Sequence, residues 1–210
     1  MAERRTRLGA RTDVARRQRG RATIDRLLDA SLAIVEQEGL EGLTTTAVTR
    51  ASGVSVGSLY HHFGSFEGLA AELYARSMAA LLDALVAELE RSRTARTGVL
   101  RFVEGYLRWG VEHPVEARVI HGSAFAGFLA ANAAAVDEAK GPRMARMLAW
   151  IEPFMARGDV VRLSPPMLEA LLVGPPAEAT RRWLAGAAGY DLDDARRALP
   201  ERVWRSVSRE

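Results

Sequence analysis

Apolar residues recur at helical spacing along almost the whole chain from residue 23 onward. The first such segment carries them three or four positions apart, at Ile24, Leu27, Leu28, Leu32 and Val35. No run alternates apolar and polar residues convincingly, as a half-buried strand would. Longer helices are predicted at about 66–91, 98–112, 115–129, 142–157, 167–173, 176–187 and 192–206, with Gly and Pro between most of them. We therefore expect an all-α protein of about nine helices.

The composition is that of an ordinary globular protein, with 48% hydrophobic and 26% charged residues. A length of 210 residues allows one large domain or two small ones. The absence of Cys excludes disulfides, thiolate metal sites and cysteine nucleophiles, and it suits a reducing compartment. The longest uncharged stretch near the middle, residues 122–136, is too short to span a bilayer, which needs about 20 apolar residues. We expect a soluble, cytoplasmic protein without membrane contact.

The net charge of +3 hides an uneven distribution. The first 21 residues hold eight arginines against Glu3 and Asp13, a local sum of +6, so the remainder sums to −3. With only Leu8 and Val14 as large apolar residues, this segment is predicted to be a flexible arm over residues 1–22. It lacks the Ser content of a transit peptide and the apolar core of a secretory signal. Two interpretations stay open: an arm that contacts DNA phosphates or a minor groove, or a solubilising tail.

Residues 48–60 have the form of a helix-turn-helix. Thr44 or Thr45 can cap the first short helix, and Gly53 can adopt the left-handed turn that ends it. Val54 fills the angle between the helices, and Ser55 caps the second. Small residues at 56–58 would let that second helix approach base edges closely. A generic helical corner remains the alternative to a DNA-binding motif.

A wider set of short strings is more discriminating. It comprises EG at 38–39, LTT at 43–45, ASGVS at 51–55, GSLYHHF at 57–63 and SFEGL at 65–69. Together these strings resemble the N-terminal domain of the TetR family of bacterial transcriptional repressors. The resemblance implies a three-helix helix-turn-helix domain at residues 23–68 and a larger helical regulatory and dimerisation domain at 69–210.

The resemblance also implies which side chains face DNA. The predicted DNA-binding set, to which Arg50 is added for its charge, is Thr45, Thr46, Arg50, Ser55, Val56, Gly57, Ser58, Tyr60, His61 and His62. Val56 and Ser58 suit a thymine methyl or a single hydrogen bond to a base, whereas Tyr60 and His62 suit phosphates. Adjacent histidines on a helix point about 100° apart. No Cys or acidic cluster completes a site around them, so we predict no metal there.

One position departs from the family pattern. Phe66 stands where the family usually has a lysine that reaches a phosphate. Losing that contact should lower affinity for DNA and flatten its salt dependence by about one unit. The arginine-rich segment could supply replacement charge, which favours its interpretation as a DNA-contacting arm.

A single unit contacts too little DNA for high specificity, so a two-fold homodimer reading two half-sites is expected. The family forms its dimer interface from the last two helices. The residues predicted to form it here are Leu172, Arg181, Leu184, Ala195, Leu199, Val203 and Trp204. The alternative for the apolar members is intramolecular core, and the arginines nearby are expected to form ion pairs with Asp193, Asp194 and Glu178.

The resemblance further implies a small-molecule pocket in the C-terminal domain. Its candidate lining residues are Phe102, Tyr106, Trp109, His121, Phe125, Phe128, Met147, Trp150 and Phe154. Their helical spacing makes most of them core, and fewer than half are expected to touch a ligand. His121 on an apolar helix is more often an interior histidine than a ligand-binding one.

An enzyme is disfavoured because the sequence shows no nucleophile-and-base arrangement, phosphate-binding loop or metal-ligand cluster, and no cofactor is expected. We predict a DNA-binding transcriptional regulator, a repressor released from double-stranded operator DNA by a small-molecule effector. The alternative is the same DNA-binding fold controlled by a protein partner.

Overall fold

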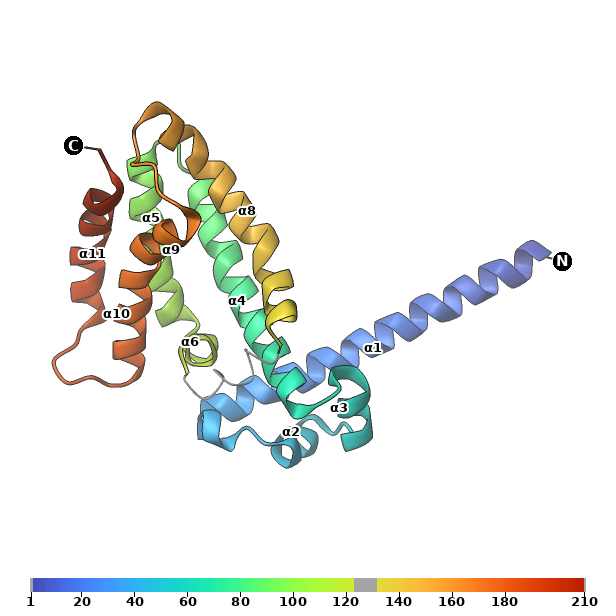
Figure 1. Ribbon diagram of the computed structural model, residues 1–210. Helices are drawn as coiled ribbons and strands as arrows, with labels where there is room; N and C mark the ends of the chain where they lie inside the picture. The colour runs from blue at the N-terminus through green and yellow to red at the C-terminus, as the bar shows by residue number, and fades with distance from the viewer. Residues whose placement is uncertain (1, 123–131, 210) are drawn as a thin grey trace. The chain divides into compact units, whose positions relative to one another are not determined.

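The computed structural model describes residues 2–122 and 132–209, with side chains from residue 18 onward except that of Ala135. This part of the chain contains ten α-helices, one short 3₁₀ helix and no strand, apart from an isolated bridge between Val160 and Ser208 (Figure 1). The prediction of an all-α protein is therefore confirmed. Within the same residues, no helix combines the length and the apolar character needed to cross a membrane.

The chain divides into two compact units, Met1–Leu73 and Tyr74–Glu210. The division falls inside α4 (Phe66–Glu90), a single helix that begins in the first unit and continues into the second. The sequence placed this boundary after residue 68, at the start of the same helix.

The first unit comprises α1 (Ala2–Glu38), the 3₁₀ helix η1 (Leu40–Gly42), α2 (Thr45–Ser52), α3 (Val56–Phe63) and the start of α4. Its core is formed by Leu27, Leu28 and Val35 of α1 together with Val48 and Leu59, all fully buried. These residues come from three helices, so α1 is the support against which the two short helices pack.

Residues 2–22, predicted as a flexible arm, are the first part of α1 in the structure (Figure 1). The segment lacks Pro and is rich in Arg and Ala, which are strong helix formers. Once the packed part of α1 has formed, each further residue adds a hydrogen bond without a new nucleation cost. The basic residues therefore continue a helix instead of forming an irregular tail.

The second unit comprises the rest of α4, α5 (Ala95–Glu112), α6 (Pro114–His121), α8 (Ala133–Arg157), α9 (Pro165–Leu172), α10 (Gly174–Leu184) and α11 (Leu192–Val207). The C-terminal helix α11 packs along α5, and α10 contacts both of them as well as α6 and α9 (Figure 1). Fully buried Leu85, Val99, Val103, Leu107 and Val207 lie in the core that these helices share.

Two helix boundaries differ from the prediction. The helix expected at 115–129 ends at His121, because Gly122 adopts an extended conformation. The break expected at Gly141-Pro142 is absent, and α8 runs through Pro142 and Pro153. Gly141 has no Cβ to clash with the following proline ring, which removes part of the penalty for a helix at this point.

Candidate nucleic-acid interface and apolar pocket

Local hydrogen bonds define the turn between α2 and α3. Thr44 Oγ1 accepts from the backbone N–H of Ala47 at 3.2 Å, and Ser55 Oγ accepts from that of Ser58 at 3.2 Å. Each side chain satisfies an N–H group that has no partner within its helix. Gly53 ends α2 with a φ of 64°, a conformation in which a Cβ would be strained. The predicted caps are confirmed, and of the two candidates for α2 the structure selects Thr44.

A contact from α1 holds this turn from behind. The Arg26 guanidinium donates to the carbonyl of Ser52 at 2.5 Å, and the Ser52 hydroxyl accepts from the N–H of Val54 at 3.2 Å. Val54 is buried beneath the turn. The sequence analysis missed Arg26, because no local pattern links it to a residue 26 positions away.

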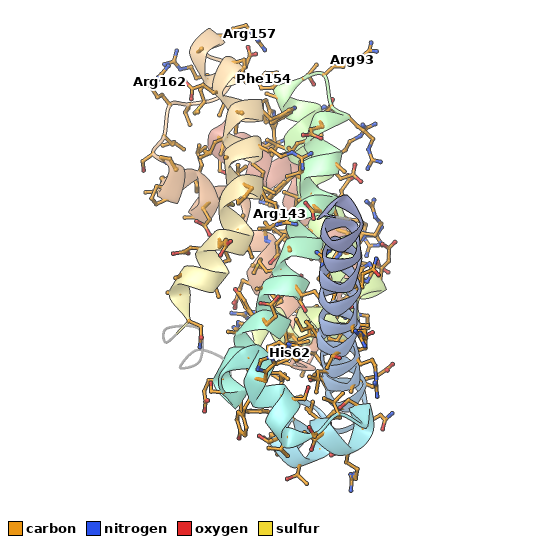
Figure 2. The ribbon with its side chains drawn as sticks, turned by 90° about the vertical axis from the view of Figure 1, so that its right-hand side faces the viewer. His62, Arg93, Arg143, Phe154, Arg157 and Arg162 are labelled. Carbon is orange, nitrogen blue, oxygen red and sulfur yellow. The ribbon has the colours of Figure 1, made fainter. Side chains whose placement is uncertain are left out.

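The outer face of α3 exposes residues that would ordinarily be inside. Val56 and Tyr60, one turn apart, are 46% and 44% exposed. Between them Gly57 is open, with no atom within 4 Å of where its Cβ would stand. Figure 2 shows His62 on the same short helix. A face of this kind can approach another surface closely and offers apolar, hydroxyl and imidazole groups to it.

None of the ten residues predicted to contact DNA is buried in the core. Exposed residues from this set are Thr46, Arg50, Ser55, Val56, Gly57, Tyr60 and His61, and half-buried ones are Thr45, Ser58 and His62. The His61 and His62 rings meet edge to face, with centroids 5.1 Å apart. Among the residues that the structure describes, no group of three or more His, Cys, Asp or Glu could hold a metal ion.

Helix α1 passes beside α3. A Cβ built on Gly20 would lie 3.7 Å from Cε1 of His62. The arginine-rich part of α1, which precedes Gly20, therefore begins next to the exposed face of α3.

The start of α4 is also capped. Ser65 Oγ accepts from the N–H of Gly68 at 3.0 Å. The Glu67 carboxylate accepts hydrogen bonds from its own backbone N–H and from Ser65, which lowers the pKa of Glu67. Phe66, where the family pattern has a lysine, is the first residue of this helix and is half-buried.

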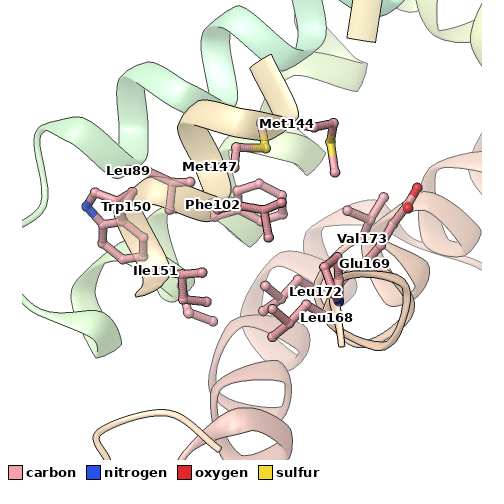
Figure 3. A pocket seen from close by; sticks show the side chains of 13 residues that line it. Leu89, Phe102, Met144, Met147, Trp150, Ile151, Leu168, Glu169, Leu172 and Val173 are labelled. Atoms are coloured by element: carbon pink, nitrogen blue, oxygen red, sulfur yellow. The ribbon is translucent and has the colours of Figure 1, made fainter. Parts of the chain in front are cut away.

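The second unit contains an apolar cavity of about 50 Å³ between α4, α5, α8 and α9 (Figure 3). Its lining consists of Leu89, Val99, Phe102, Met144, Met147, Leu148, Trp150, Ile151, Pro165, Leu168, Glu169, Leu172 and Val173. Glu169 is the one ionisable residue in this lining. The cavity therefore suits the apolar part of a small molecule.

A second cavity of about 70 Å³ adjoins the first along α8. The residues that both share are Met144, Met147, Glu169 and Val173. The remainder of its lining is Met78, Leu81, Leu82, Leu85, Tyr106 and Lys140. Two of the shared side chains are those of Met, which are flexible.

Comparison with known proteins identifies the first unit. Residues 27–73 match the family model described as bacterial regulatory proteins, tetR family. This segment is a TetR-family DNA-binding domain. An HTH-type transcriptional regulator of Bacillus subtilis, YobS, is 28% identical over 88 residues, which are 42% of this chain and 46% of YobS. The match thus spans about half the length of that relative.

Solved structures of similar proteins share the fold of this chain over most of its length. A TetR-family regulator from Shewanella has a TM-score of 0.72 at 19% identity, covering 90% of this chain and 99% of that one. The regulator FadR of Bacillus subtilis, solved with stearoyl-CoA, has a TM-score of 0.67 at 14% identity, covering 85% of this chain and 96% of its own. At these identities the likeness establishes a TetR-family fold.

The predicted ligand residues fall into separate groups. Phe102, Met147 and Trp150 line the first cavity, and Tyr106 lines the second. Trp109 lies in a different, charged groove, whereas His121 and Phe154 line neither cavity. Phe125 and Phe128 lie outside the described residues. The sequence analysis missed several lining residues, among them Leu89, Val99, Met144, Leu168 and Glu169.

Tyr106, which is buried, and His121, which is half-buried, form a pair instead. The Tyr106 hydroxyl lies 3.4 Å from Nε2 of His121. Burial, with a smaller contribution from Tyr74, raises the pKa of Tyr106 above its usual range. Burial, followed by the nearby charge of Arg181, lowers the pKa of His121 to about 4. Both groups are therefore neutral near pH 7.

Some residues predicted for the dimer interface face the core of their own chain. Ala195 and Val203 are buried where α11 packs along α5, and Leu172 lines the first cavity. Ala195 and Val203 are therefore covered within the chain in this packing. The half-buried members are Leu172, Leu184, Leu199 and Trp204.

The arginines of α10 and α11 pair with nearby acids, as expected. Arg181 is exposed and forms hydrogen bonds of 2.7 and 2.8 Å with Glu178. Together with Arg182, it lowers the pKa of Glu178 to about 2. On α11, Arg196 pairs with Asp193 at 3.4 Å, and Arg197 pairs with Asp194.

Proposed function

We propose that this TetR-family protein is a homodimeric transcriptional repressor that leaves its operator when a small apolar molecule occupies the C-terminal cavity. The observation that carries the proposal is the exposed face of α3. This face belongs to a helix whose start is capped by a side chain, and the helix lies within the segment that matches the family.

The residues on this face suit a DNA major groove. Val56 and Ser58, in the first turn of α3, can contact a thymine methyl or make one hydrogen bond to a base edge. Gly57 leaves room for close approach. Tyr60 and His62 suit phosphates, which fix the register of the protein on DNA.

The arginine-rich segment supports a larger phosphate contact. Eight arginines lie within the first 21 residues, and α1 passes beside His62 at Gly20. Positive charge is thus concentrated next to α3. In this proposal it replaces the phosphate contact that Phe66 cannot make.

Two copies would read two half-sites whose centres are one DNA turn apart, about 34–36 Å. Half-buried Leu184, Leu199 and Trp204 remain available on α10 and α11 for a second copy. The exposed ion pairs of Arg181 and Arg197 would then border the apolar contact.

Control by a ligand is supported by the continuity of α4. This helix starts directly after the DNA-reading helices, and its residue Leu89 lines the apolar cavity. A ligand that favours one position of α4 would change the separation of the two recognition helices and lower operator affinity. The complex of FadR with stearoyl-CoA is consistent with an apolar occupant. A cavity of this kind also argues against control by a protein partner alone.

Selection of bound fragments from genomic DNA, followed by fluorescence anisotropy on the enriched sequence, tests DNA binding. Tyr60→Phe and Tyr190→Phe each remove one hydroxyl, the first on the exposed face of α3 and the second in the C-terminal unit. Only Tyr60→Phe should weaken operator binding, by several-fold. Lack of an enriched sequence, or equal effects of the two changes, would contradict the proposal.

The arginine-rich segment has its own test. Deletion of residues 1–20 should weaken operator binding and reduce the slope of log affinity against log salt. Unchanged affinity and slope would show that the segment does not contact DNA.

A further inference from the structure

We infer that the effector is an elongated apolar molecule lying along α8, and that Trp150 sets the greatest length the site accepts. This inference rests on the proposed function and names the class of ligand and the residue that selects it.

The two adjoining cavities share Met144 and Met147 of α8, and together their linings reach from Lys140 to Ile151 of that helix. In this inference the flexible Met side chains move aside and the two cavities open into one trough. The eleven helical steps from Lys140 to Ile151 correspond to about 16 Å at 1.5 Å per residue. A trough of that length, lined almost entirely by apolar side chains, fits a chain-like molecule better than a compact one.

Trp150 closes one end of the trough. Its ring lies so close to α5 that a Cβ on Gly98 would stand 2.0 Å from Cη2. On the other side, the Phe154 ring packs against it with centroids 4.8 Å apart, and the Arg157 guanidinium lies 4.8 Å from the centre of the Phe154 ring. Figure 2 shows Phe154 and Arg157 at the same end of the molecule. The half-buried indole thus packs against α5 at Gly98 and against the Phe154 ring, which limits its movement in these two directions.

The other end of the trough is polar. Figure 3 shows Glu169 on the far side of the first cavity from Trp150 and Leu89. Lys140, the one lysine of the chain, lines the adjoining cavity together with Glu169, and its ammonium lies 5.7 Å from the centre of the Tyr74 ring. One charge of each sign at this end favours a polar head group without fixing its charge. Chain length, set at the Trp150 end, is therefore the property that the site selects.

Binding of straight-chain probes to the purified protein without DNA tests the inference. The probes are 1-alkanols and alkanoates from octyl to octadecyl, below their micellar concentrations, measured by isothermal titration calorimetry. Affinity should rise by about fourfold per methylene, the value for burying one CH₂, and stop rising at the length that fills the trough. Affinity that does not depend on length would overturn the inference.

Shortening Trp150 should move that limit. Trp150→Phe and Trp150→Ala are expected to shift it to longer chains, with the larger shift for Ala. Trp183→Phe on α10, outside both cavities, is the matched control and should leave the limit unchanged. If Trp150→Ala does not fold, Trp150→Phe decides alone. A limit unmoved by Trp150→Phe, or moved equally by Trp183→Phe, would overturn the assignment.

The head-group end gives an internal check. Lys140→Met should weaken alkanoates more than alkanols, and neither Lys140→Met nor Glu169→Gln should move the length limit. A shift of the limit by either change would overturn the placement of the head group.

Operator release, measured separately by anisotropy, distinguishes this inference from the proposed function. Probes that bind with a length limit set by Trp150 but leave operator affinity unchanged would refute effector control and keep the length limit. Operator release by probes whose affinity is independent of length would refute the length limit and keep effector control.

Discussion

Replacing Gly98 with Ala tests the packing on which the closed end of the trough depends. Gly98 lies inside α5, where a glycine costs about 0.5–1 kcal/mol relative to Ala. A substitution to Ala should therefore stabilise an open helix. Here the new methyl group would stand 2.0 Å from Cη2 and 2.3 Å from Cζ2 of Trp150.

The expected magnitude follows from these distances. Carbon atoms pack best at about 3.5–4.0 Å, so the indole and α5 would have to separate by at least about 1.5 Å. Phe154 limits movement of the indole on its other side. Overpacking of this kind costs about 1–3 kcal/mol, and the helix gain offsets part of it. The net loss of unfolding free energy should be about 1–2 kcal/mol.

Urea unfolding at one fixed protein concentration measures the effect, because a dimer is stabilised by mass action. The double variant Gly98→Ala/Trp150→Ala removes the clash, so in that background Gly98→Ala should become neutral or stabilising. The coupling free energy between the two sites is then about 1–3 kcal/mol. Gly105→Ala in the same helix is the control, because its nearest neighbour is the flexible Glu88 side chain at 3.1 Å.

Two results would refute this reasoning. One is a Gly98→Ala protein as stable as the Gly105→Ala protein. The other is a loss of stability at Gly98 that persists unchanged when Trp150 is Ala, since the cost would then arise elsewhere in α5.

Four further outcomes are expected. Ser55→Ala should lower the unfolding free energy by about 1 kcal/mol in urea titrations, because the N–H of Ser58 loses its acceptor, and an unchanged midpoint would exclude a capping role. Gly57→Ala should leave stability equal or higher but weaken operator binding in anisotropy assays, since its methyl group meets only open space in the free protein. Phe66→Lys should steepen the salt dependence of operator binding by about one unit, and an unchanged slope would show that position 66 lies away from phosphates. The unfolded chain protonates His121 near pH 6.5 and the folded chain only near pH 4, so stability should fall as the pH drops through this window. His121→Gln should flatten the fall, and an identical pH profile for both proteins would argue against a neutral His121.

The helix-turn-helix could be predicted in detail because its determinants are local. The cap of α2 joins Thr44 to Ala47 and that of α3 joins Ser55 to Ser58, each three residues apart. The left-handed turn depends on Gly53 alone. Interactions between residues this close in the chain can be recognised in the local sequence, so the sequence pattern predicts the observed geometry.

The pocket and the outer helices could be predicted only in part. Periodicity indicates that a residue is buried, but it does not identify the residues against which that residue packs. Ala195 and Val203 have the spacing of an interface stripe, yet α11 turns them toward α5, about 90 residues earlier in the chain. Leu89 and Glu169 line the same cavity, although their helices are far apart in sequence. Gly98 likewise looks unfavourable in a helix until Trp150 is placed against it.

The walls of the trough differ in stiffness, and this difference explains why length should be selected more sharply than width. Along its side, α8 is tied to α4 by Arg143 with Asp83, at 2.7 and 2.9 Å, and by Arg146 with Glu90, at 2.8 to 3.0 Å. Such solvent-exposed pairs are worth only about 0–1 kcal/mol each, so α8 can move away from α4 at small cost. At the Trp150 end of the trough, the close packing of Trp150 against Gly98 does not allow a comparable movement. In the proposed mechanism, a wider ligand would shift α4, the helix that continues into the DNA-binding unit, whereas a longer one would be refused.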